Sequence, residues 1–235
     1  MALDIRSVTS LLAHWSAPRL GELFGRDPQH AAPWVSVLAQ EGLAEAQLCY
    51  GRMLLQGTGM PKDSVAALNW FRRAAGQGHI DAVNMVGRCH DNGWGTAEDP
   101  QAAAEHYRFA ADTGHAWALY NLGHLYLDGR GVARDVDAAY RCYRRAAGLG
   151  HERAMNLVGR CCEEGWGTAR DLTAAADWYQ RSAQGGYFRG QYNWATLLLQ
   201  QQRMDEAAVW FERAAAGWPR SLAAVAGRGR PFGGQ

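Results

Sequence analysis

The chain repeats itself every 36 residues. Glycine recurs at this spacing at three positions of the unit, and aspartate recurs at a fourth. The members are Gly42, Gly78, Gly114, Gly150 and Gly186; Gly51, Gly87, Gly123 and Gly159; Gly57, Gly93, Gly129 and Gly165; and Asp63, Asp99, Asp135 and Asp171. Several residue types held at one spacing without drift indicate one structural unit that is copied and stacked. Such solenoids typically work by presenting a surface.

Each unit is expected to begin with an amphipathic helix. In the second unit Ala82, Val83, Val86 and Cys89 have the spacing that places side chains on one face of a helix, which we predict over residues 80–92. A glycine follows this helix directly, and glycine readily adopts the left-handed conformation that ends helices.

The second half of the unit predicts another helix. Asp99 is a favourable N-cap, and Pro100 follows it at the first helical position. Alanines then form the inner stripe together with Tyr107, and Gly114 ends the helix. Gly87 lies inside the first helix, where glycine costs about 1 kcal/mol relative to alanine. We therefore expect another helix backbone to pass close to Gly87.

These elements together resemble a known family. The pattern A-x-x-x-x-G-x-x-x-x-x-G-x-G-x-x-x-D, followed by A-x-x-x-Y-x-x-A-A-x-x-G, is similar to the Sel-1-like repeat, a relative of the tetratricopeptide repeat. In the third unit it is formed by Ala118, Gly123, Gly129, Gly131, Asp135, Ala139, Tyr143, Ala146, Ala147 and Gly150. The resemblance implies an all-α protein, a right-handed α-solenoid of stacked antiparallel helix pairs.

The repeat also predicts the organisation of the chain. We expect residues 1–41 to contain a capping helix over residues 4–16 and a half-repeat that begins at Pro33. Four full repeats follow, over residues 42–77, 78–113, 114–149 and 150–185. A degenerate fifth repeat with a tetratricopeptide-like turn covers residues 186–217, and a partly disordered tail covers residues 218–235. Atypical ends are expected because terminal repeats cover an exposed apolar face.

Composition excludes some classes of partner. The 24 basic and 23 acidic residues give a net charge of +1, which offers no electrostatic footprint for nucleic acid or anionic membrane. The first 15 residues lack the features of a signal peptide, and no apolar run of about 18 residues occurs. Five cysteines without regular pairing are typical of a reducing compartment. We expect a cytoplasmic protein without membrane insertion or nucleic-acid binding.

The family resemblance also suggests where a partner would bind, because in tetratricopeptide relatives the first helices line a concave groove. The corresponding positions carry Arg52, Asn84, Arg88, Tyr120, His124, Asn156, Arg160 and Tyr192. Arginine and asparagine can hold a peptide backbone or a terminal carboxylate. The alternative is that Arg88 and Arg160 pair with acidic residues on their own helices, as His124 could with Asp128.

A longer period of 72 residues singles out two tryptophans. The second and fourth repeats share V-G-R-C and G-W-G-T-A, which place Trp94 and Trp166 between turn glycines. An exposed tryptophan at this edge could anchor an interface. Alternatively, each indole folds back over the edge of its own repeat.

Other notable side chains predict structural roles. His79, His115 and His151 follow repeat glycines, but neighbouring helices lie about 8–10 Å apart, too far for ligands that must approach a metal to about 2.0–2.1 Å. The resemblance implies a turn role for this Gly-His pair. Of Cys161 and Cys162, we expect one to face the core.

No known catalytic motif occurs, so we predict no catalytic, cofactor or metal site. The leading hypothesis is a protein–protein interaction module, an adaptor or regulator that holds a peptide or partner helix in the groove. One alternative is an enzyme with an unrecognised site formed by Arg88, His90, His124 and Cys162. Another, implied by the resemblance, is an accessory role in a bacterial uptake system, such as one for siderophores or iron, or in an envelope system.

Overall fold

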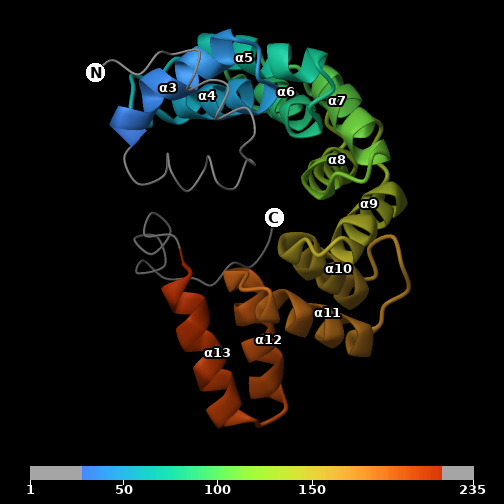
Figure 1. Cartoon of the computed structure of the whole chain (residues 1–235). Helices are drawn as coiled ribbons and strands as arrows, with labels where there is room; N and C mark the ends of the chain where they lie inside the picture. The colour runs from blue at the N-terminus through green and yellow to red at the C-terminus, as the bar shows by residue number, and fades with distance from the viewer. Residues whose placement is uncertain (1–27, 219–235) are drawn as a thin grey trace. The chain divides into compact units, whose positions relative to one another are not determined.

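The computed structural model describes residues 28–218, and this part of the chain is entirely helical (Figure 1). The helices are α3 (Pro28–Gln40), α4 (Ala44–Gln56), α5 (Ser64–Gly76), α6 (Ile80–Asn92), α7 (Pro100–Asp112), α8 (Ala116–Asp128), α9 (Val136–Gly148), α10 (Glu152–Glu164), α11 (Leu172–Gln184), α12 (Phe188–Gln200) and α13 (Met204–Ala216). The prediction of an all-α solenoid of helix pairs is confirmed, and the first helix of repeat two spans the predicted residues 80–92.

The helices associate in sequence order within two compact units. The first unit contains residues 28–118 and 128–133 of the described chain, and the second contains residues 119–127 and 134–218. In the first unit α4 packs on α5, α5 on α6 and α6 on α7; in the second, α9, α10, α11, α12 and α13 pack consecutively. Each unit therefore shows the neighbour-to-neighbour contacts expected of a solenoid.

The second helices begin at the predicted aspartate caps. The Asp99 carboxylate accepts a hydrogen bond from the Ala102 N–H at 2.9 Å, and Pro100 occupies the first turn. The equivalent carboxylates at 63, 135 and 171 make the same contact three residues onward. At the end of α6, Gly93 takes the left-handed conformation with φ of 67°. The predicted boundaries of the repeat unit therefore have the expected local chemistry.

Gly87 makes room chiefly for an aromatic ring, and the expected close helix backbone is found at its counterpart Gly159, where a Cβ atom would lie 3.2 Å from the carbonyl oxygen of Ala175 on α11. A Cβ atom at Gly87 would lie 2.8 Å from Cε1 of Tyr107, whose ring comes from the paired helix α7. Tyr107 is fully buried, and its hydroxyl donates a hydrogen bond to Asp91 at 3.2 Å. Equivalent pairs are Gly51 with Phe71, Gly123 with Tyr143 and Gly159 with Tyr179. The helix glycine therefore makes room for the ring that fills the gap within its own pair.

The second glycine of each turn makes a contact between repeats. Gly95 has φ of +74°, and a Cβ atom there would overlap the backbone of Ser64 at the start of α5, in the preceding repeat. Gly131 approaches Pro100 in the same way, and Gly167 approaches Val136. These three glycines, which are 36 residues apart, thus place each turn against the N-terminus of the second helix in the preceding repeat.

The core consists of small side chains and a few large aromatic ones. Ala67, Phe71, Ala74 and Ala82 are completely buried in the first unit. We expected one of Cys161 and Cys162 to face the core, but both side chains are buried. Burial raises the pKa of the Cys161 thiol to about 12, which keeps it protonated.

The N-terminal end of the described chain differs from the prediction, and the C-terminal end agrees with it. The half-repeat helix α3 begins at Pro28, five residues before the predicted start at Pro33, which lies inside the helix. The fifth repeat has the short turn expected of it, between Gln200 and Met204. The predicted capping helix over 4–16 and all but the first residue of the tail over 218–235 lie outside the described residues. Between 28 and 218, no helix is sufficiently long and apolar to cross a membrane.

Candidate partner-binding surface

Two arginines of the predicted groove stack on the two turn tryptophans. The guanidinium of Arg88 lies 5.0 Å from the ring centre of Trp94, and that of Arg160 lies 5.1 Å from the ring centre of Trp166. Each pair joins a first helix to the turn that follows it, and the two pairs are 72 residues apart. Cation–π contacts of this kind hold a planar guanidinium by its face.

The indole of Trp94 folds back onto the core between the first and second repeats. Both tryptophans are half-buried, and Trp94 packs against the core of the first unit that contains Leu68 and Val86. The stacked arginine covers the ring further. A role for Trp94 or Trp166 as an interface anchor stays a prediction.

The own-helix ion pairs considered for Arg88 and Arg160 do not occur. Asp91 instead pairs with Arg130 at 3.0 Å and accepts from Tyr107, while Glu163 accepts the Tyr179 hydroxyl at 2.6 Å. The ion pairs formed among residues 28–218 include none of Arg52, Arg88 and Arg160. The acidic residues are thus engaged by other groups, and the three guanidinium groups lack a carboxylate partner within the described chain.

In the first unit, Arg52 and Arg88 are accessible but Asn84 is not. Arg52 is exposed on α4, Arg88 is half-buried on α6, and Asn84 is only 6% exposed. The positive charge of Arg52 is near enough to help lower the pKa of Asp81, although the hydrogen bond from His115 is the main cause. The accessible predicted residues of this unit are therefore the two arginines, and the exposed Asp81 lies on the same helix as Arg88.

In the second unit the predicted residues gather around aromatic rings. Tyr120 and His124 lie edge to face with ring centres 4.6 Å apart, and His124 also contacts Tyr143 at 5.4 Å. Asn156 is 6% exposed, and its Oδ1 accepts a hydrogen bond from Asn193 at 2.8 Å. Tyr120 and His124 therefore form one cluster, while Asn156 is tied to the next repeat.

Tyr192 and Arg160 are the exposed members of the set in the second unit. Tyr192 is 38% exposed and lies edge to face with Phe211 at 5.5 Å. Sequence reasoning missed Asn193, which holds Asn156, and Phe211, which supports Tyr192. The 37-residue step from Asn156 to Asn193 was the available signal, but it departs by one residue from the 36-residue period.

Two of the three repeated histidines, His79 and His115, link successive first helices. His79 Nε2 lies 2.7 Å from a Glu45 carboxylate oxygen, and His115 Nε2 lies 2.9 Å from Asp81. The His115 Nδ1 accepts the Ala118 N–H, and His151 Nδ1 accepts the Ala154 N–H, both at 3.1 Å. The turn role expected for this column is therefore present.

The four residues considered for an unrecognised enzyme site lie in different surroundings. Arg88 and His90 belong to the first unit, whereas His124 and Cys162 belong to the second. The ring of His90 stacks on that of His106, with ring centres 5.6 Å apart. Burial is the main cause that lowers the pKa of His90, and the charge of His106 lowers it further. Within residues 28–218 no group of three or more His, Cys, Asp or Glu side chains could hold a metal ion.

Known proteins share the repeat and the fold of this chain. The family described as Sel1 repeat matches residues 43–79, 80–115, 118–151, 152–187 and 189–217. A search of curated proteins gives no match. A Sel1 repeat protein from Oxalobacter formigenes has a similar structure, with 28% identity and a TM-score of 0.76 over 84% of this chain and 82% of that one.

Two further solved structures are similar. The protein c5321, a protective antigen of uropathogenic Escherichia coli strains, is 28% identical with a TM-score of 0.70 over 85% of this chain. This chain covers 44% of c5321, less than half of its length. The immunity protein PA5088 from Pseudomonas aeruginosa is 15% identical with a TM-score of 0.61 over 92% of this chain and 87% of that one, a likeness of fold alone. With five matched repeats spanning most of its helices, the chain belongs to the Sel1 repeat family.

Proposed function

We propose that this protein is an adaptor or regulator that binds an extended peptide or a partner helix on its first helices. Sel1 repeats are commonly protein–protein interaction scaffolds and are typically non-catalytic. The observation that carries the proposal for this chain is the state of Arg88 and Arg160. Each is held by a tryptophan and forms no ion pair with another described residue.

The stacked geometry favours an acidic partner. A guanidinium whose carbon lies over an indole can keep its N–H groups, which lie in the guanidinium plane, free to form two parallel hydrogen bonds to a carboxylate. Because the tryptophan already restricts the side chain, less conformational entropy is lost when a ligand binds. We therefore expect Arg52, Arg88 and Arg160 to receive Asp or Glu side chains of the partner. Tyr120, His124 and Tyr192 would supply apolar and polar contacts beside them.

Asn84 and Asn156 have a different part in this proposal. Both are buried, and Asn156 is bound to Asn193. They position the neighbouring first helices, and the arginines and tyrosines make the contacts with the partner. We place this interaction in the cytoplasm, which is supported by the five cysteines, all of them free.

Two triple variants with equal loss of charge test the proposal. The first replaces Arg52, Arg88 and Arg160 with alanine; the control replaces Arg72, Arg108 and Arg141, which are exposed on second helices. Affinity capture from an extract of the source organism is followed by quantitative mass spectrometry.

We expect the first variant to capture at least one partner in about tenfold smaller amount than wild type, because it loses charge-assisted hydrogen bonds to that partner. The control variant should capture the same partner in the wild-type amount. If every captured protein survives both triple substitutions equally, the first helices are not the binding surface.

A further inference from the structure

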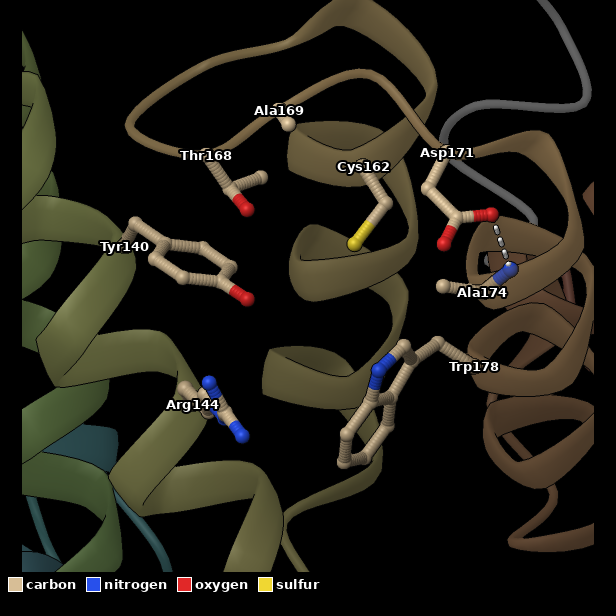
Figure 2. Close-up of a pocket in the computed structure, with 8 residues that line it drawn as sticks. All are labelled: Tyr140, Arg144, Cys162, Thr168, Ala169, Asp171, Ala174 and Trp178. Atoms are coloured by element: carbon tan, nitrogen blue, oxygen red, sulfur yellow. Dashed lines mark hydrogen bonds between the residues drawn. The ribbon is translucent and has the colours of Figure 1, made fainter.

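A second candidate site lies in the second unit and includes none of the residues predicted for the partner-binding groove. A pocket of about 270 Å³ opens between α9, the end of α10 and the start of α11 (Figure 2). It is lined chiefly by Tyr140, Arg144, Cys162, Thr168, Asp171 and Trp178. Ligand pockets for drug-sized molecules usually measure about 300–1,000 Å³, so this one suits a group the size of a single side chain.

The polar groups of the pocket are mainly hydrogen-bond donors. Figure 2 shows the Arg144 guanidinium and the Tyr140 hydroxyl facing the same space, with Thr168 above them. Arg144 is exposed and forms no ion pair with another described residue. The acidic lining residue, Asp171, accepts hydrogen bonds from the Thr173 and Ala174 N–H groups at 3.0 and 2.9 Å, both at its Oδ1 atom, which therefore serves as the cap of α11. A ligand that supplies acceptors is therefore favoured.

The remaining surface is apolar. Cys162 is 4% exposed, and burial, followed by the charge of Asp171, raises the pKa of its thiol, so the sulfur is neutral. The Tyr140 hydroxyl hydrogen-bonds to this sulfur when no ligand is present. The indole of Trp178 borders the pocket, and Arg181 covers its ring with the guanidinium carbon 4.2 Å from the ring centre. A flat apolar group can lie against this indole while a charged end reaches Arg144.

We propose that this pocket binds a free carboxylate carried on one apolar or aromatic group of side-chain size. The Arg144 fork would take the carboxylate, the hydroxyls of Tyr140 and Thr168 would add hydrogen bonds, and Trp178 would contact the apolar group. The C-terminal residue of a polypeptide and a small organic acid share this chemistry. Because the pocket contains none of the first-helix arginines, it is independent of the proposed partner-binding surface.

The chain contains its own comparison site. At the positions 72 residues earlier, Arg72 replaces Arg144, while Leu68, His90 and His106 replace Tyr140, Cys162 and Trp178. There the two imidazole rings stack on one another at 5.6 Å, and the tyrosine hydroxyl and the indole are missing. The arginine is thus retained, with Thr96 and Asp99 at the positions of Thr168 and Asp171, but without the tyrosine, the cysteine and the tryptophan, which makes Arg72 a matched control.

The test uses small probes and the full-length protein. N-acetylphenylalanine and its uncharged amide are titrated by calorimetry or by NMR chemical-shift changes into wild type, Arg144→Ala, Trp178→His, Tyr140→Phe and Arg72→Ala, each checked for helicity by circular dichroism. An acetylated tripeptide that ends in phenylalanine and phenylacetate distinguish the two sources of the carboxylate. Tyr140→Phe keeps the ring and therefore tests the hydroxyl without removing the packing.

We expect wild type to bind the acid at least tenfold more tightly than the amide. The affinity for the acid should fall about tenfold in Arg144→Ala and in Trp178→His, and several-fold in Tyr140→Phe. Arg72→Ala should bind as wild type does. Tighter binding of the tripeptide assigns the pocket to a polypeptide C-terminus, and equal or tighter binding of phenylacetate assigns it to a small acid. The proposal is overturned if acid and amide bind equally, if Arg144→Ala leaves affinity unchanged, or if no probe binds at millimolar concentration.

Discussion

At the scale of single residues, Gly87 shows how a missing side chain holds a helix pair together. The Tyr107 ring occupies the space that a Cβ atom of residue 87 would need. The hydrogen bond from its hydroxyl to Asp91 limits how far the ring can move away. Glycine inside a helix is unfavourable by about 1 kcal/mol relative to alanine. The close packing of a large buried ring offsets this cost.

Gly87→Ala should destabilise the protein despite its better helix propensity. Overpacking of a well-filled core costs about 1–3 kcal/mol, which exceeds the propensity gain of about 1 kcal/mol in most of that range. Urea unfolding followed by circular dichroism measures the difference in the free energy of unfolding. Gly148→Ala is the matched control, because a Cβ atom there meets nothing within 4 Å. Equal stability of Gly87→Ala and Gly148→Ala would contradict the explanation.

The contact between Asp81 and His115 makes a pH-dependent contribution. The hydrogen bond from His115 is the main cause that lowers the pKa of Asp81 from its usual 3.8. A carboxylate with a lowered pKa in the folded state stabilises the protein above its unfolded-state pKa, and this stabilisation is lost as pH falls through the folded-state value.

Asp81→Asn should therefore be less stable than wild type near pH 7, and the gap should close below about pH 3.8. Chemical unfolding at pH 7, 5 and 3 gives the comparison. Asp112→Asn, an exposed position at the end of α7, serves as control and should show no pH-dependent gap. A gap for Asp81→Asn that stays constant down to pH 3 would show that the contact does not depend on the carboxylate charge.

At the scale of helices, the aspartate caps decide where second helices begin. Asp99→Ala should cost about 1 kcal/mol, because the Ala102 N–H loses its acceptor. Asp99→Asn keeps a capping oxygen and should stay within a few tenths of a kcal/mol of wild type. Thermal unfolding of the two variants separates them. If Asp99→Asn loses as much as Asp99→Ala, charge rather than capping explains the effect.

The boundaries of the helices in the full repeats were predictable because their signals are local, whereas the start of α3 was not. Asp99, Pro100 and Gly93 act within one turn of the helix that they begin or end, and the structure shows each of them in that role. The purpose of Gly95 was not predictable, because its close neighbour Ser64 belongs to another repeat. Contacts between repeats depend on the stacking geometry, which the spacing of one unit does not contain.

The accessibility of the candidate surface was also hard to predict. The family resemblance predicts groove positions for Asn84 and Asn156, yet each is only 6% exposed. The burial of Asn156 follows from a hydrogen bond to Asn193 on the next first helix, and buried polar groups are stable when they are paired. The stacking of Arg160 on Trp166 likewise depends on how the turn folds back. Sequence alone gives the polarity of such positions but not their partners.

At the scale of the whole molecule, a chain of neighbour-only contacts should respond locally to damage. Gly87 belongs to the first unit and Gly159 to the second, and each accommodates a ring within its own helix pair. The losses in stability of Gly87→Ala and Gly159→Ala should add to within about 0.5 kcal/mol in the double variant.

Hydrogen exchange should show increased opening of α6 and α7 in Gly87→Ala, and of α10 and α11 in Gly159→Ala. Gly148→Ala combined with either substitution is the control and should change neither pattern. A double variant that departs from additivity by more than about 1 kcal/mol would indicate coupling beyond nearest neighbours.

The fit of Gly95 against Ser64 has a consequence for how such a chain can change in length during evolution. Because the contact joins residues at one fixed phase of consecutive repeats, duplication or loss of a whole 36-residue segment recreates it at the new junction. Insertion of one or two residues in the turn moves the glycine out of register and places a side chain against backbone. Natural length variants should therefore differ by whole repeats, and the shared motifs of repeats two and four are the expected trace of duplication in pairs.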